Sequence, residues 1–216
     1  MALLIAEIFR MDQNKQIRLY ADLMEEVKLR VTCIDNAANG RTGLPTPIVR
    51  EFCYLQLRML CELVAIACLV AHGDITLVQP HKIGKTTAAQ DILNELSKLR
   101  PHFYPMAATQ TVGNSFRIDI IFDKSPLPKE ELILLYGKCH RHLHRGSLKG
   151  LLNADSALDL NISVPEIIEW TQKINDLLSF HIIAINSDRL FGCMLRNMSD
   201  GGKVQVFVAD ALAVNI

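Results

Sequence analysis

The chain has 216 residues, half of them hydrophobic and 21% charged, which is enough apolar material for one packed domain and excludes a disordered protein. Its 23 basic and 23 acidic residues give a formal net charge of zero. Proteins that coat nucleic acid usually carry a basic excess, because they bind by neutralising phosphates, so the net charge gives no support to RNA as a partner.

Apolar residues at helical spacing predict five helices along the chain. They cover residues 12–36, 47–71, 86–99, 129–144 and 164–178. Glycine or proline follows each of the first three, as expected at helix ends. The second half of the 47–71 helix is apolar on all sides, so we expect this helix at the centre of the core.

Strand-like segments finish the chain at residues 180–185, 189–196 and 203–209. The last two are separated by Ser199-Asp200-Gly201-Gly202, which strongly indicates a hairpin. Further upstream, residues 106–124 alternate poorly, but the part from 115 to 122 is rich in β-branched residues. This segment fits either a strand or an ordered loop.

Together these elements predict an α+β fold that is mainly α. Residues 1–178 would form an antiparallel bundle of four to five helices, and residues 179–216 a C-terminal antiparallel β-hairpin or meander packed on it. An isolated hairpin is only marginally stable, so the β element needs a supporting surface. We expect that surface on the fifth helix or on a second protomer.

The six cysteines include no CxxC pair, and three of them, Cys53, Cys61 and Cys68, lie in the apolar 47–71 helix. Thiols in such a helix are best explained as small buried hydrophobic groups. The pattern favours a reduced, cytoplasmic protein. No basic segment precedes the apolar start MALLIAEIFR, so we expect no signal peptide.

Residues 52–71 are the most apolar stretch and are about long enough to span a bilayer. Three polar residues interrupt this stretch: Gln56, Arg58 and Glu62. It is therefore better explained as the core helix of a soluble bundle, and we expect no membrane partner.

The segment Gly84-Lys85-Thr86-Thr87 lies between a strand-like segment and a helix, the order that a phosphate-binding P-loop requires. A P-loop also needs a glycine where this chain has Gln79, and Pro80 then removes a backbone amide. Asp123, after an apolar segment, resembles a magnesium-binding Asp only superficially. We favour threonines that cap a helix, and we predict no cofactor.

Four potential metal ligands lie close together in Cys139-His140-Arg141-His142-Leu143-His144. On a helix, His140 and His144 share one face while Cys139 and His142 share another, so at most two converge. Hydrogen-bonded or solvated histidines explain the segment without a metal, and we predict no metal site.

Basic residues follow one face of the same helix and its continuation. They are Lys138, Arg141, Arg145 and Lys149. Such a run could meet phosphates or an acidic partner, but it is more typical of a solvated helix C-terminus.

Arg58 and Glu62 are four residues apart, on one face of the otherwise apolar 47–71 helix. Charges inside a bundle must be paired, so the simpler interpretation is a structural ion pair at the bundle edge. Alternatively, the 129–144 helix presents His140 or His144 to this pair. An acid, a base and a cation would then share one cleft, as general acid–base catalysis requires.

Residues 48–75 (IVREFCYLQLRMLCELVAIACLVAHGDI) and 135–146 (LYGKCHRHLHRG) resemble a family of small uncharacterised bacterial cytosolic proteins. Two antiparallel helix pairs, with Tyr-x-x-Cys-x-x-x-Leu-His near the end of the fourth helix, also resemble the HEPN class of helical domains over residues 12–146. Many HEPN domains are ribonucleases of toxin–antitoxin or phage-defence systems, and others are inactive binding modules. Catalytic members separate their Arg and His by more than the three positions between Arg141 and His144.

Two functions from different classes follow. In the first, the protein is a non-catalytic helical interaction module that binds a protein partner or itself, as in a homodimer, with the β element as the docking surface. In the second, it is a HEPN-type ribonuclease whose catalytic residues are Arg58, Glu62, Arg141 and His144. A P-loop nucleotide-binding enzyme is a distant third.

Overall fold

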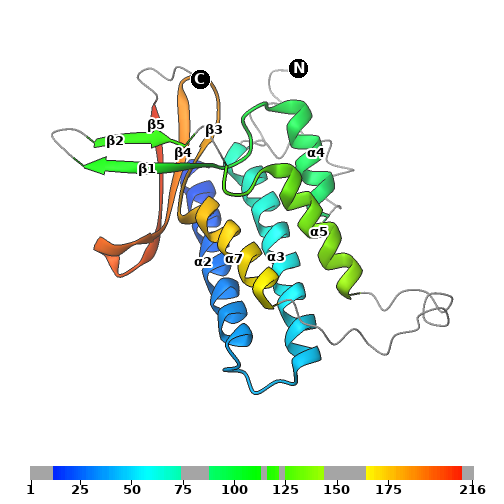
Figure 1. The fold of residues 1–216 in the computed structure, drawn as a ribbon. Helices are drawn as coiled ribbons and strands as arrows, with labels where there is room; N and C mark the ends of the chain where they lie inside the picture. The colour runs from blue at the N-terminus through cyan, green and yellow to red at the C-terminus, as the bar shows by residue number, and fades with distance from the viewer. Residues whose placement is uncertain (1–11, 74–87, 113–115, 122–124, 144–163, 211–216) are drawn as a thin grey trace.

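The computed structural model describes residues 12–73, 88–112, 116–121, 125–143 and 164–210. Within these ranges the chain forms five α-helices and one five-stranded antiparallel sheet (Figure 1). The predicted fold class, α+β and mainly α, is confirmed.

The helices form where the apolar spacing predicts them. α2 and α3 are an antiparallel pair joined by a short turn that contains two glycines with positive φ (Figure 1). Gly73 ends α3 in the left-handed conformation, with φ of 61°, which glycine adopts without steric cost. The helices are α2 (Gln13–Ala38), α3 (Thr46–His72), α4 (Ala89–Leu99), α5 (Lys129–Leu143) and α7 (Val164–Ser179).

The central position of α3 confirms the prediction for the most apolar helix. It packs against α2, α4, α5 and α7, and ten of the thirteen residues from Leu60 to His72 are buried. By length and composition α3 could cross a membrane, but 61% of its most apolar window is buried inside the protein. That burial is typical of the core helix of a soluble domain. Cys53, Cys61 and Cys68 are free and buried in this core, as predicted.

The sheet has the strand order β2-β1-β3-β4-β5 and is larger than the predicted C-terminal meander. The segment that fitted either a strand or a loop forms the hairpin β1–β2, and Met106 and Ala107 of β1 pair with Ile182 and His181 of β3. The β element therefore extends beyond residues 179–216. The strands are β1 (Met106–Val112), β2 (Phe116–Ile120), β3 (Phe180–Ala184), β4 (Arg189–Asn197) and β5 (Lys203–Asp210).

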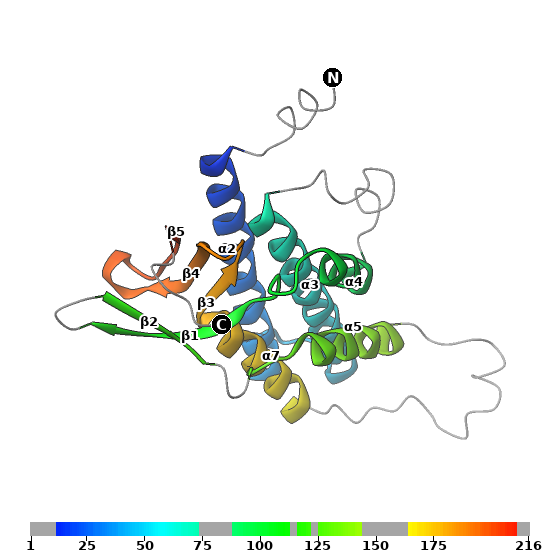
Figure 2. The ribbon, with the colours of Figure 1, turned by 90° about the horizontal axis from the view of Figure 1, so that it is seen from above.

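One face of the sheet packs on α2 and α7 (Figure 2). Side chains alternate between the two faces of a sheet. Phe191 and Cys193 of β4 belong to the core on the helix side, whereas Leu190 and Met194 point to the other face, as does Phe207 of β5. None of the described helices lies on that outer face. The expected support from the fifth helix, α7, is confirmed, and α2 adds to it.

A buried hydrogen bond joins the helices to the sheet. The hydroxyl of Tyr20 on α2 lies 2.6 Å from Nε2 of His181 on β3, and Nδ1 of His181 lies 3.0 Å from the carbonyl oxygen of Leu178. A carbonyl oxygen only accepts, so Nδ1 carries the ring proton, and Tyr20 must donate to Nε2. Both side chains are fully buried, and His181 is neutral in this arrangement.

Candidate functional site

A polar and aromatic stripe follows one side of α3. Its members are Arg50, Tyr54, Arg58 and Glu62, which recur every fourth residue and therefore lie one above another on the helix surface. The stripe contacts side chains of α5, and Tyr54 also lies close to Glu166 of α7. Sequence reasoning identified Arg58 and Glu62 but missed Arg50 and Tyr54, although the same four-residue spacing could have indicated them.

Arg58 and Glu62 form a closed triangle with Tyr136 of α5. Arg58 Nε donates to Glu62 Oε1 at 3.2 Å, and the Tyr136 hydroxyl donates to the same oxygen at 3.2 Å. The Arg58 guanidinium also lies 5.3 Å from the centre of the Tyr136 ring, within range of a cation–π interaction. Burial raises the pKa of Tyr136, with Arg58 acting in the opposite direction, so this hydroxyl stays protonated at neutral pH.

His142 of α5 occupies the other end of the stripe. Its ring stacks on Tyr54, with the ring centres 4.0 Å apart, and its Nδ1 lies 2.9 Å from a guanidinium nitrogen of Arg50. Arginine only donates, so Nδ1 accepts and the imidazole is neutral. Burial, followed by the positive charge of Arg50, lowers the pKa of His142. The neutral His142 ring is held by Arg50 and Tyr54 and packs α5 against α3.

Glu166 connects α7 to the same region. Its carboxylate forms an ion pair with Lys138 of α5 and accepts a hydrogen bond of 3.3 Å from the Trp170 indole. The hydrogen bond from Lys138 holds the pKa of Glu166 below its usual value. The same carboxylate contributes, after burial, to raising the pKa of Tyr54 to about 12. These contacts hold α5 and α7 together beside α3.

The candidate metal ligands separate in the way that helical spacing predicts. Cys139 is buried, and burial raises the pKa of its thiol to about 12, so the thiolate that binds metals is not formed at neutral pH. His140 is exposed, and His142 is held by Arg50 and Tyr54. No group of three potential ligands occurs in the described ranges.

The four residues proposed for ribonuclease activity are only partly brought together. Arg58 and Glu62 contact each other, and the hydroxyl of Tyr136 on α5 hydrogen-bonds to both. Arg141 is exposed on α5 and makes no hydrogen bond or ion pair with them. His144 lies outside the described residues, as do the P-loop candidate 84–87, Asp123, Arg145 and Lys149.

Comparisons with protein-family models, curated proteins and solved structures gave no match. The stripe must therefore be interpreted from its geometry. Arg58 and Glu62 pair with each other and with the Tyr136 hydroxyl, and Arg50 donates to the neutral His142 ring. Burial raises the pKa of Tyr54, Tyr136 and Cys139, so these groups stay protonated at neutral pH. Such a network fixes α3, α5 and α7 against one another.

Proposed function

We propose that the protein is a non-catalytic interaction module that pairs with a second copy of itself through the β5 edge of its sheet. The observation that carries this proposal is the position of β5, which ends the strand order in the part of the chain that the structure describes. A strand in that position has backbone N–H and C=O groups on one side that can pair with another chain.

A single hydrogen bond identifies the side of β5 that faces away from β4. The Val204 N–H donates to Glu25 Oε1 of α2 at 2.9 Å, so it points away from β4. Backbone groups alternate in direction along a strand, and those of Val206 and Val208 therefore point the same way as that of Val204. Near the start of the strand, Glu25 and Lys28 of α2 bond Val204 and Gly202, but Val206 and Val208 have no strand beside them among the described residues.

β5 lacks the usual devices that prevent edge pairing. Its sequence KVQVFVAD is eight residues long, contains no proline, and carries charges only at its two ends. Natural edge strands are usually short, charged or interrupted by proline, because a long apolar edge pairs with other chains. An unprotected edge of this kind is typical of a strand that has a partner.

The sequence of β5 favours a second copy as that partner. Two antiparallel β5 strands related by a two-fold axis at Phe207 would place Val206 of each chain opposite Val208 of the other. The two Phe207 residues would lie opposite each other at the axis, each with its ring over Gly192 of its own chain. This register leaves the Val204–Glu25 bond intact. The zero net charge of the chain also opposes association less than a large charge of one sign would.

Val206→Pro tests this pairing, since proline removes an N–H that points away from β4 and leaves the β4–β5 ladder complete. We expect the wild type to have the mass of a dimer by light scattering coupled to size-exclusion chromatography, and Val206→Pro that of a monomer. Val206→Ala is the matched control, because it shortens the same side chain but keeps the N–H, and it should stay dimeric.

Two results would contradict the proposal. One is a wild type that is monomeric at every concentration. The other is a Val206→Pro variant that remains dimeric with unchanged circular dichroism. A monomeric wild type that nevertheless captures an extended peptide at β5 would replace the second copy with a protein partner.

A HEPN-type ribonuclease is the second candidate, and the packing of α5 against the Arg58 and Glu62 side of α3 favours it. If the enzyme hypothesis is right, His144→Ala should abolish RNA cleavage and leave the melting temperature unchanged. If the pair is only structural, Arg58→Ala should lower the free energy of unfolding by about 1 kcal/mol. A cleavage rate that is equal in wild type and His144→Ala would exclude the ribonuclease.

A further inference from the structure

Two side chains of α2, Glu25 and Lys28, hold the start of β5. Glu25 Oε1 accepts the Val204 N–H at 2.9 Å, and Lys28 Nζ donates to the carbonyl oxygen of Gly202 at 2.7 Å. Lys28 Nζ also donates to Glu25 Oε2 at 2.7 Å. These three hydrogen bonds form one connected unit between helix and strand, which we call the Glu25–Lys28 clasp.

The Glu25 carboxylate lies where the carbonyl group of a further strand would lie. The Val204 N–H points away from β4, so in a larger sheet it would donate to the next strand. Glu25 supplies a charged acceptor there instead, and hydrogen bonds to charged acceptors are stronger than those to neutral ones. The hydrogen bonds from Lys28 and from the Val204 N–H lower the pKa of Glu25, so the carboxylate is charged at neutral pH.

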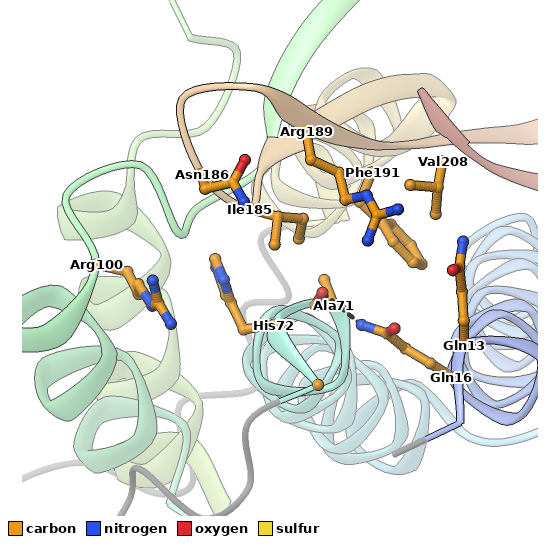
Figure 3. A pocket seen from close by; sticks show the side chains of 11 residues that line it. Gln13, Gln16, Ala71, His72, Arg100, Ile185, Asn186, Arg189, Phe191 and Val208 are labelled. Atoms are coloured by element: carbon orange, nitrogen blue, oxygen red, sulfur yellow. Dashed lines mark hydrogen bonds between the residues drawn. The ribbon is translucent and has the colours of Figure 1, made fainter. Parts of the chain in front are cut away.

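The other end of β5 is not held in this way. A pocket lies there, where Val208 faces the first turn of α2 (Figure 3). The polar side chain of Gln16 is directed away from the strand, since its Nε2 donates to the carbonyl oxygens of Val70 and Ala71 in α3, at 2.9 and 2.6 Å. In the described part of the chain, α2 makes no hydrogen bond to Val206 or Val208. The clasp thus closes only the first position of the β5 edge.

We propose that the Glu25–Lys28 clasp determines how far a partner strand can pair along β5, and confines it to the part of the edge beyond Val204. This inference rests on the proposed pairing of two β5 strands. Covering part of an edge is one of the ways in which proteins limit the pairing of a long strand. Here it would keep the ladder between the two copies short and the dimer reversible.

The register centred on Phe207 shows what the clasp excludes. In that register Asp210 of the other chain would lie opposite Val204, and opposed residues exchange hydrogen bonds in an antiparallel pair. The Asp210 carbonyl would therefore compete with Glu25 for the Val204 N–H. The Asp210 side chain would also lie on the same face as Glu25, and two carboxylates at close range repel each other. With the clasp in place, only Val206 and Val208 of each chain can exchange hydrogen bonds.

Glu25→Ala tests the clasp, because it frees the Val204 N–H for the second copy. We expect the dissociation constant of the dimer, measured by sedimentation equilibrium, to fall about tenfold or more through the hydrogen bonds added at each end of the ladder. A clasp that only anchors β5 to α2 predicts an unchanged or weaker dimer. Glu25→Gln keeps an oxygen that can accept the Val204 N–H and should stay close to the wild type.

Two further variants show whether the gain arises at the edge. Glu95→Ala removes the corresponding ion pair with Lys98 on α4, which lies on the opposite side of α3 from β5 (Figure 2). The side chains of Glu95 and Glu25 are both 46% exposed, so this control is closely matched and should keep the wild-type dissociation constant. Adding Val206→Pro to Glu25→Ala should return the protein to a monomer.

Amide hydrogen exchange, measured by NMR, locates the change in the strand. In the wild type the Val204 amide should be protected equally at low and high protein concentration, because Glu25 bonds it in the monomer as well. In Glu25→Ala its protection should rise with concentration, as that of Val206 does in both proteins. Val204 protection that does not depend on concentration in Glu25→Ala would contradict the proposed role of the clasp.

The outcomes separate this inference from the proposed function. If the wild type is a dimer and Glu25→Ala does not tighten it, the clasp is only an anchor and the inference is wrong, while the pairing of β5 stands. If the wild type is a monomer and Glu25→Ala is a dimer, the proposed function is wrong as stated and the clasp is supported. Monomers in both cases would overturn both.

Discussion

Lowering the pH from 6.5 to 4 is expected to reduce the free energy of unfolding by about 3 kcal/mol through one buried side chain, His181. Burial lowers the pKa of His181 to about 4, against an ordinary value of 6.5. In that pH range the unfolded chain binds a proton that the folded protein excludes. Stability therefore falls as the pH falls below 6.5, and the loss is complete below about 4.

Urea unfolding at pH 7.5 and at pH 5, with wild type and His181→Gln, measures this contribution. The glutamine amide does not titrate, so the variant should lose clearly less stability between the two pH values, although it is less stable at both. Glu25 and Glu166 also have lowered pKa values, but they lose stability only below about 4.5 and do not interfere at pH 5.

His142 shares this pH range, because its pKa is also lowered. His142→Gln is therefore the necessary control and should retain the larger part of the acid effect. If His181→Gln and the wild type lose equal stability between pH 7.5 and pH 5, the buried neutral histidine does not account for the acid sensitivity.

Gly192→Ala is expected to destabilise the protein by about 1–3 kcal/mol, because the new methyl group needs space that is already filled. A Cβ at position 192 would overlap the ring of Phe207, which lies across the glycine from the neighbouring strand. An aromatic ring that covers a cross-strand glycine is a recognised way to stabilise a sheet. The measurement is the free energy of unfolding in urea.

A double-mutant cycle with Phe207→Ala separates this overlap from a general effect of alanine in the strand. Once the ring is removed, Gly192→Ala should cost much less, or should even stabilise the strand, since alanine loses less entropy than glycine on folding. An equal cost in both backgrounds would contradict the explanation.

The elements that were predictable from the sequence depend on residues close together in the chain. α3 ends at Gly73, and the β4–β5 turn contains Gly201 and Gly202, both with positive φ. The pairing of β1 with β3 was not predictable, because it joins Met106 to Ile182 and depends on the packing of the helices between them. For the same reason, the hydrogen bond between Tyr20 and His181, which are 161 positions apart, was not predictable.

The candidate site follows the same rule. Arg58 and Glu62 are one helical turn apart, and their pairing was predictable from spacing alone. Tyr136 was not, because its contact with them depends on how α5 lies against α3. The pocket lined by Gln16, His72, Arg100 and Arg189 could not be inferred at all, since these residues come from α2, α3, the end of α4 and β4.

The antiparallel pairing of β1 with β3 has a consequence for how the protein folds. Most of the sheet, from β3 to β5, is built from neighbouring segments and can form early, whereas β1 must wait until α5 and α7 have brought the two distant parts of the chain together. Closing so long a loop costs chain entropy before any contact compensates for it. We therefore expect the joining of the β1–β2 hairpin to the sheet to be a late and slow step.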